Sequence, residues 1–132
     1  MASKNKLKRF EENKTFLNLI QPSREKIIKN QFELKGNWNL NYFKNNNPIV
    51  LELGCGKGEY TLYLSELNPE INYIGIDIKG ARIWRGAKTA FEKGIKNVAF
   101  VRIQIELITS LFSSREIDEI WITFPDPQIK YK

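Results

Sequence analysis

Residues 48–60 read P-I-V-L-E-L-G-C-G-K-G-E-Y, and they decide the fold because a strand, a glycine turn and a helix start follow one another without a gap. The apolar, largely branched residues 49–51 and 53 predict a strand that is buried on both faces of a parallel sheet. Glu52 interrupts this run, and a carboxylate inside a buried strand is strongly destabilising unless it is paired. We therefore expect Glu52 to find a partner at the strand's end, either in the protein or on a ligand.

Three glycines follow the strand at alternate positions, Gly54, Gly56 and Gly58. Glycine lets the backbone turn tightly and lets a ligand approach with no Cβ in the way. A P-loop requires Lys after its last glycine, and a dinucleotide-binding loop requires a wider spacing before its third glycine, so neither motif fits. The E-x-G-x-G pattern resembles motif I of the S-adenosylmethionine-dependent methyltransferases of Rossmann-like fold, which implies that Gly54 and Gly56 bind this cofactor. A plain strand-to-helix turn is the alternative interpretation.

The distribution of charge divides the chain into a basic N-terminal third and a remainder with no net charge. Its 132 residues, 42% of them hydrophobic, suffice for one domain with a core. The net charge of +6 comes from residues 1–47, where ten Lys and Arg accompany four Glu, whereas residues 48–132 carry eleven charges of each sign. We predict a basic N-terminal arm with a short helix (1–47) and an incomplete S-adenosylmethionine-binding domain (48–132). The arm is either a solvated tail or a segment that neutralises nucleic-acid phosphates.

Six aromatic residues in the arm are too many for a purely disordered segment. We expect them to pack the arm onto the domain, and stacking on unpaired bases is the alternative. They are Phe10, Phe16, Phe32, Trp38, Tyr42 and Phe43.

One cysteine and no histidine limit the chemistry. Cys55 cannot form an internal disulfide, and the chain lacks the usual metal ligand and general base. We expect no metal site and expect Cys55 to fill space in the glycine turn. The sequence has no apolar run of about 20 residues and no signal-peptide core, so we predict a cytoplasmic protein with no membrane partner.

Strand patterns recur after the glycine loop. Residues 73–77 predict a second strand that ends in Asp77, where doubly wound folds hold the hydroxyls of a ribose; capping of the next helix is the alternative. A third strand at 97–102 is followed by Gln104, and a fourth at 119–123 leads to the carboxyl edge of the sheet. With helices expected at 59–67 and 81–93, the sequence predicts an α/β fold with a parallel sheet of order 3-2-1-4 and helices on both faces.

The second of these helices carries a basic stripe. Arg82, Arg85 and Lys88 recur at every third residue, directly after Lys79. The stripe is either a solvated helix face or a surface that meets nucleic-acid phosphates close to the cofactor crevice.

The loop F-P-D-P at residues 124–127 indicates the reaction. Its prolines fix φ on either side of Asp126 and so hold a carboxylate rigidly. F-P-D-P followed by Lys130, together with E-L-G-C-G, resembles the tRNA (guanine-N7-)-methyltransferase family over nearly the whole chain. The resemblance implies methyl transfer from S-adenosylmethionine to N7 of a guanine in tRNA. It also implies that Asp126 is catalytic and binds the cofactor, and that Lys130 contacts tRNA.

The same resemblance assigns Glu52, Asp77 and Gln104 to the cofactor. Gln104 departs from the family's usual acid, although its amide oxygen can accept the same hydrogen bond, and Gln128 stands where many members have Trp. Guanine N7 has an in-plane lone pair, so methyl transfer to it requires alignment and no general base. Asp126 either stabilises the charge that develops on the guanine or accepts hydrogen bonds from its N1 and N2 donors.

The chain ends soon after this loop, and the resemblance implies a seven-stranded sheet of which four strands are expected here. With the C-terminal strands missing, the fourth strand forms an edge with Ile120 and Ile122, which favours self-association. Two other hypotheses remain open: a methyltransferase for another substrate, and a non-catalytic fragment that binds the cofactor or RNA.

Overall fold

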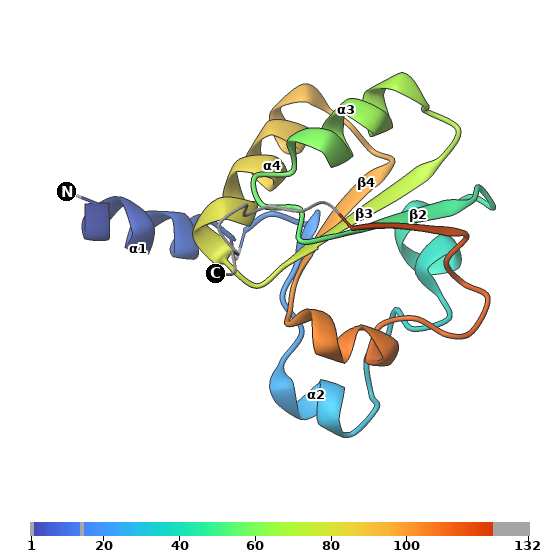
Figure 1. Cartoon of the computed structure of the whole chain (residues 1–132). Helices are drawn as coiled ribbons and strands as arrows, with labels where there is room; N and C mark the ends of the chain where they lie inside the picture. The colour runs from blue at the N-terminus through green and yellow to red at the C-terminus, as the bar shows by residue number, and fades with distance from the viewer. Residues whose placement is uncertain (1, 14, 123–132) are drawn as a thin grey trace, which may run out of the picture.

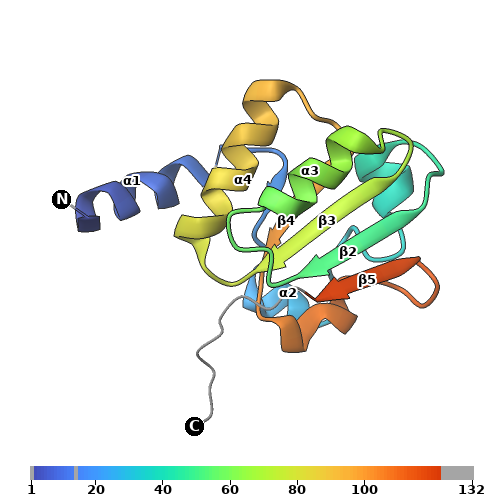
Figure 2. The same ribbon diagram turned by 45° about the horizontal axis from the view of Figure 1, so that its top comes forward.

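A parallel sheet forms the centre of the computed structural model, which describes residues 2–13 and 15–122, with side chains from residue 5 onward. Within these residues the sheet has five strands in the order β1-β4-β3-β2-β5, and Figure 2 shows β4, β3, β2 and β5 side by side. The strands are β1 (Leu19–Ile20), β2 (Ile49–Leu53), β3 (Asn72–Asp77), β4 (Val98–Arg102) and β5 (Glu119–Ile122).

The predicted order 3-2-1-4 is confirmed, because the four predicted strands appear as β4-β3-β2-β5. Every residue of β2 is buried, as expected for a central parallel strand. The register sets Glu52 of β2 beside Gly75 of β3 on one side and beside Trp121 of β5 on the other. Parallel alignment therefore brings the carboxyl ends of the strands, with their acidic residues, to one edge of the sheet.

Strand β1, which the arm adds beside β4, was not predicted from the sequence. Leu19 pairs with Phe100 and Ile20 with Val101, and the Phe100 amide donates to the Asn18 carbonyl at 2.8 Å. Two residues are too short a run to show a strand period, so only the tertiary structure reveals this pairing.

Helices α3 (Glu59–Leu67) and α4 (Gly80–Lys93) cover one face of the sheet (Figure 1). The helices predicted at 59–67 and 81–93 are thus confirmed, and Gly94 ends α4 with a left-handed φ of 67°. Apolar residues of α3 and α4 pack against the strands in one core cluster that includes Leu62, Ile83, Ala87, Val98 and Phe100.

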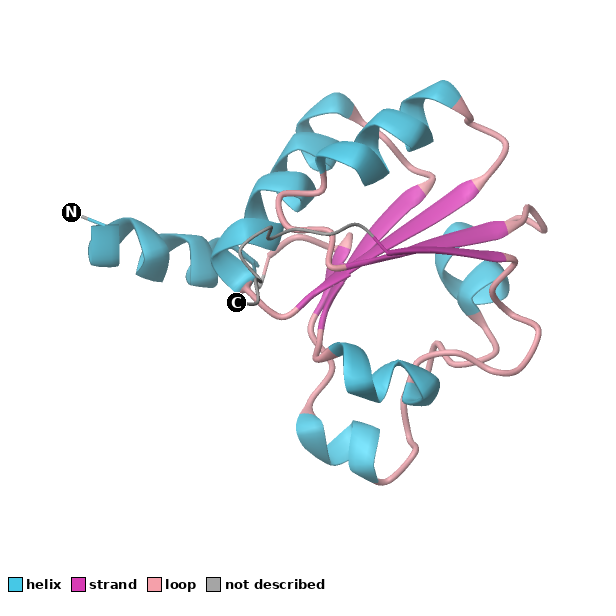
Figure 3. Cartoon of the chain, in the orientation of Figure 1, coloured by secondary structure: helices cyan, strands magenta, loops and turns pink. Residues whose placement is uncertain are grey.

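The opposite face is covered by α2 (Arg24–Ile28), the π-helix η1 (Trp38–Phe43) and the 3-10 helix η2 (Ile105–Ser110). Figure 3 shows helical segments on both sides of the sheet, which confirms the predicted layering. Most of this second layer comes from the N-terminal segment. Residues 19–43 therefore contribute directly to the core that supports β2, β3 and β4.

Trp38 is the centre of this second core. It is fully buried, its indole N–H donates to the Leu111 carbonyl oxygen at 2.9 Å, and the Phe112 ring lies 5.6 Å away between centroids. The Tyr42 hydroxyl donates to the Val98 carbonyl oxygen at 3.0 Å, and burial raises the pKa of this hydroxyl. The expected packing of arm aromatics onto the domain is confirmed here, with Phe43 also buried in this cluster.

Helix α1 (Ala2–Asn13) was also missed by the sequence analysis, because its sequence is strongly polar and its apolar periodicity is poor. It lies beside α4 in both orientations of the ribbon (Figures 1 and 2). The Asn13 amide donates to the Gly80 carbonyl oxygen at 3.0 Å, and Phe16 packs near Phe91 with ring centroids 5.8 Å apart. Helix α1 therefore packs on α4, and the Arg102 guanidinium of β4 lies 5.2 Å from the centroid of its Phe10 ring.

We expect Trp38→Ala to lower the free energy of unfolding by about 3–5 kcal/mol, because it leaves a large cavity and removes the hydrogen bond to Leu111. Leu40→Ala in the same π-helix is the matched control, since Leu40 is 73% exposed and its removal should change stability by less than about 0.5 kcal/mol. Urea unfolding followed by circular dichroism measures both changes. Equal stability of the two variants would contradict this role of the N-terminal segment.

Candidate functional site

The glycine loop at residues 54–58 is fixed to the neighbouring strand by its backbone. The Gly54 and Cys55 amides both donate to the Ile76 carbonyl oxygen, at 2.8 and 2.9 Å. Gly54, Gly56 and Gly58 all adopt positive φ, between 58° and 75°, which side-chain-bearing residues rarely do. The loop therefore lies against the end of β3, at the carboxyl edge of the sheet.

Glycines also allow the loop to lie close to α4. A Cβ on Gly58 would lie 2.6 Å from Cε1 of Phe100, and a Cβ on Gly86 would lie 2.8 Å from Cζ of the same ring and 2.9 Å from the Lys57 carbonyl oxygen. Sequence reasoning did not single out Gly86, although a glycine in a helix interior often marks such a close approach. Phe100 thus sets the distance between the loop, α4 and β4.

Glu52 is buried near the end of β2 and accepts a hydrogen bond from the Thr61 hydroxyl of α3. The expected partner at the strand's end is therefore found in the protein. Thr61 was missed because nothing in its local sequence relates it to Glu52, nine residues earlier.

Asp77 ties the end of β3 to the glycine loop. One carboxylate oxygen accepts from the Gly56 amide at 2.8 Å, and the other accepts from the Lys79 amide at 2.9 Å. The N-cap position of α4 is Lys79, so Asp77 does not itself occupy the capping position. Each carboxylate oxygen has two lone pairs, so a further hydrogen bond to a ligand is chemically available.

Two cavities flank Gly54, which lines both of them. The first, of about 290 Å³, is lined by Glu52, Gly54, Cys55, Gly56, Lys57, Glu59, Tyr60 and Arg82. The second, of about 300 Å³, is lined by Gly54, Asp77, Ile78, Ile103, Gln104, Ile105 and Glu106. We refer to the pair as the carboxyl-edge crevice.

The structure brings five sequence-predicted residues together in this crevice. Glu52 and Gly56 line the first cavity, Asp77 and Gln104 line the second, and Gly54 joins them. Asp126 and Lys130 lie outside the described residues. The crevice suits an elongated ligand with cationic or hydroxyl groups near the carboxylates and an apolar ring against the isoleucines. Ile78, Ile105 and Glu106 were not singled out from the sequence.

Cys55 is buried beside the loop, as expected for a space-filling residue. Burial raises the pKa of its thiol well above the usual value, and the nearby carboxylates of Asp77 and Glu52 raise it further. Little thiolate forms at neutral pH, so Cys55 is a poor nucleophile. Among the residues that the structure describes, no three His, Cys, Asp or Glu side chains gather in a way that could hold a metal ion.

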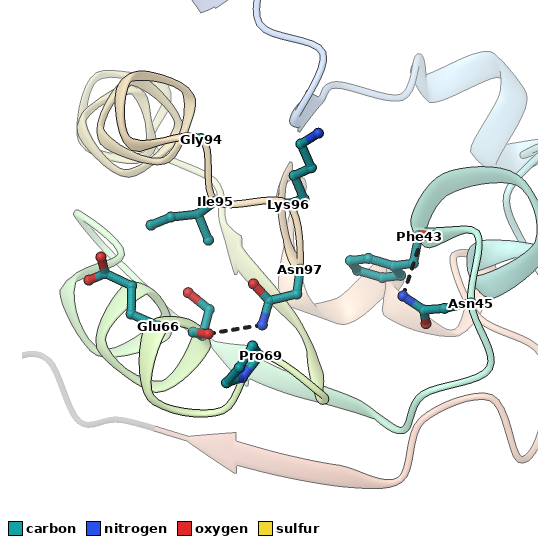
Figure 4. A pocket seen from close by; sticks show the side chains of 9 residues that line it. Phe43, Asn45, Glu66, Pro69, Gly94, Ile95, Lys96 and Asn97 are labelled. Atoms are coloured by element: carbon teal, nitrogen blue, oxygen red, sulfur yellow. Dashed lines mark hydrogen bonds between the residues drawn. The ribbon is translucent and has the colours of Figure 1, made fainter.

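A larger cavity, of about 480 Å³, lies at the amino ends of the strands (Figure 4). Asn97 lines this cavity, and its side-chain amide donates to the carbonyl oxygens of Ser65, Asn68 and Ile71 at 2.8–3.2 Å. These bonds join the end of α3 to the start of β4. None of the predicted site residues lines this cavity.

A family model described as "Putative methyltransferase" matches residues 46–132. A protein of Christiangramia forsetii named tRNA (guanine-N(7)-)-methyltransferase is 69% identical over 132 residues, which are 100% of this chain and 59% of that protein. A protein of Bacteroides fragilis with the same name is 47% identical over 96% of this chain and 50% of its own length. The chain thus spans between half and three fifths of these two relatives.

Two solved structures share the fold. "Structure of an Antibiotic Related Methyltransferase" matches with a TM-score of 0.57 and 25% identity, over 64% of this chain and 44% of that chain. "The structure of PKMT2 from Rickettsia typhi in complex with AdoHcy" matches with a TM-score of 0.50 and 26% identity, over 69% of this chain and 19% of that chain. Both likenesses agree with the Rossmann-like architecture derived from the sheet order.

We expect the Cys55 thiol of the folded chain to react at least about a hundredfold more slowly with a disulfide reagent at ~pH 8 than the thiol of the urea-unfolded chain. The raised pKa leaves less thiolate at this pH in the folded chain than in the unfolded chain, because unfolding exposes the thiol to water and separates it from the neighbouring carboxylates. Lys96→Cys supplies an exposed thiol as the control and should react fast in the folded chain. Equally fast labelling of Cys55 before and after unfolding would contradict the buried position.

Proposed function

The chain belongs to a family of methyltransferases, and on this premise we propose that it binds S-adenosylmethionine in the carboxyl-edge crevice and methylates N7 of a guanine in tRNA. The observation that carries the proposal is the meeting of Glu52, Gly54, Gly56, Asp77 and Gln104 in one crevice. The reaction is supported by the names of the two relatives, which the chain covers only in part.

The residues of the crevice fit this cofactor chemically. A Cβ on Gly56 would meet no heavy atom within 4 Å, so the loop leaves open space where the ligand lies. Asp77 has the acceptor capacity that paired ribose hydroxyls need, and the Gln104 amide is suited to an adenine edge between Ile103 and Ile105. Glu52 carries the negative charge on the side where the amino group of the methionine moiety binds. S-Adenosylmethionine then supplies an electrophilic methyl group on its sulfonium.

Asp126 and Lys130 supply the substrate side of the proposal, by resemblance in sequence. Guanine N7 attacks with its own lone pair, so the chain needs groups that align the base and does not need a proton acceptor. A carboxylate at Asp126 either accepts hydrogen bonds from the guanine or stabilises its developing positive charge. Lys130 neutralises a tRNA phosphate.

Two further properties belong to the proposal. No helix within residues 2–13 and 15–122 is long and apolar enough to cross a bilayer. We propose that the protein acts in the cytoplasm, where its tRNA substrate is found.

We also propose that β5 pairs with β5 of a second copy, since β5 lies at the edge of the sheet formed by the described residues and its Ile120 and Ile122 are 52% and 61% exposed.

Asp126→Ala should reduce methyl transfer to unmodified tRNA by about 10²–10³-fold, because alignment and charge stabilisation of the guanine are lost. The affinity for S-adenosylmethionine should fall much less. Transfer of labelled methyl groups, followed by mapping of the modified base, measures the first effect, and calorimetry measures the second. The exposed carboxylate Glu70 provides the control variant Glu70→Gln, for which both quantities should stay unchanged.

The proposed reaction is wrong if the unsubstituted chain binds the cofactor but forms no N7-methylguanine in tRNA. Equal losses of cofactor affinity and methyl transfer in Asp126→Ala would contradict the catalytic assignment alone.

Sedimentation velocity tests the proposed pairing of β5. The unsubstituted chain should shift with rising concentration from 15.5 kDa towards twice that mass. Ile122→Lys should stay monomeric because a charge on an edge strand opposes pairing, whereas Leu67→Lys on the exposed surface of α3 should behave like the unsubstituted chain. A chain that stays monomeric at every concentration would overturn the pairing.

A further inference from the structure

The surface formed by α1 and α4 gathers positive charge around one tryptophan. Trp84 of α4 is only 9% exposed, and three cationic groups lie over its ring. The Arg9 guanidinium of α1 is 4.3 Å from the ring centroid, and the Lys88 ammonium and the Arg85 guanidinium of α4 are 5.0 and 5.7 Å away. Each lies within the range of a cation–π contact. We call Arg9, Arg85 and Lys88 the Trp84 cluster.

Specific contacts fix α1 in this position. The Trp84 indole N–H donates to a carboxylate oxygen of Glu12 at 2.8 Å, and the Asn13 amide donates to the Gly80 carbonyl oxygen at 3.0 Å. A Cβ on Gly80 would lie 2.8 Å from the Phe10 ring, so the two helices approach closely only because this residue is glycine. The positions of the cations are therefore a consequence of how α1 packs.

The Glu12 carboxylate on the Trp84 indole offsets only part of the positive charge of Arg9, Arg82, Arg85 and Lys88. Among the described side chains, no Asp or Glu forms an ion pair with Arg82, Arg85 or Lys88. The described ion pairs join Lys26 to Glu33, Lys29 to Glu25 and Lys93 to Glu66. Like charges held this close repel one another, and an anionic partner relieves that repulsion.

The cluster is continuous with the carboxyl-edge crevice. Arg82 and Lys57 line the first cavity of the crevice. Arg85 and Lys88 follow Arg82 at steps of three residues on α4, and side chains at this spacing are neighbours on a helix surface. The three positions span about 9 Å of helix. A row of cations therefore leads from the crevice to the Trp84 cluster.

We propose that the Trp84 cluster binds the phosphodiester backbone of an RNA strand whose target base enters the crevice. This inference rests on the proposed function and adds where, beyond the crevice, the substrate is held. A polyphosphate strand carries its charge at regular intervals and so matches a row of cations, and arginine side chains bind phosphates through two parallel hydrogen bonds. The N-terminal segment, through Arg9, is thus part of the RNA-binding surface.

The double variant Arg85→Gln/Lys88→Gln tests the proposal. Binding of fluorescently labelled, unmodified tRNA is followed by anisotropy over a series of salt concentrations. We expect the affinity to fall by about 10–100-fold and the slope of log K against log salt to decrease by about 1–2, because two phosphate contacts are lost. Arg9→Gln should decrease the slope by about 1.

Lys26→Gln/Lys29→Gln is the matched control, since it removes the same charge from α2 and its C-cap residue, on the opposite face of the sheet. This control should leave the affinity for tRNA and the salt slope unchanged. Calorimetric affinity for S-adenosylmethionine should be equal in all four proteins, which also verifies that each variant is folded. In a methylation assay the double variant should raise KM and leave kcat near that of the unsubstituted chain.

The outcomes separate this inference from the proposed function. Equal loss of tRNA affinity in the α2 control and in the double variant, or no loss in either, would overturn the RNA surface while methyl transfer still stands. Binding of the unsubstituted chain to anionic lipid vesicles but not to tRNA would overturn it in favour of a membrane surface. Conversely, tRNA binding that weakens as expected, in a chain that methylates no tRNA, would support the surface and contradict the proposed reaction.

Discussion

The carbonyl oxygen of Ile76 accepts two backbone hydrogen bonds from the glycine loop, and the rest of the site depends on this attachment. Directly after it, Asp77 accepts a third from Gly56. The glycines of the loop all have positive φ in this position, which residues with side chains rarely adopt. As a result, the ends of β2 and β3 meet and Glu52 and Asp77 open into adjoining cavities on the two sides of Gly54.

Phe100 extends this constraint to the helices. Its ring lies where a Cβ on Gly58, Gly75 or Gly86 would clash, so the loop, β3 and α4 all approach it closely. The position of α4 in turn decides where its basic side chains point. Trp84 then binds α1 through Glu12 and Arg9, which places the positive charge of Arg9 on the same surface as the basic residues of α4. The proposed cofactor crevice and the proposed RNA surface are thus linked by packing, through the buried Phe100 ring and α4.

Local patterns in the sequence predicted much of this arrangement. The strand order followed from four apolar runs and the rules of parallel sheets, and Glu52 and Asp77 followed from carboxylates at the ends of strands. The rest depended on contacts between residues far apart in the chain. The pairing of β1 covers two residues, α1 has a polar sequence, and Trp84 has no local feature that identifies it as the contact for Arg9. Thr61 likewise acquires its role only when α3 packs over β2.

Calorimetric titration of the chain with S-adenosylmethionine shows whether the carboxyl-edge crevice binds this compound, as we propose. We expect one binding site per chain and at least about tenfold weaker binding, or about 1.4 kcal/mol, in Asp77→Asn, with the affinity of Glu70→Gln unchanged. If the unsubstituted chain does not bind, or if Asp77→Asn binds with the same affinity, the crevice is not the cofactor site.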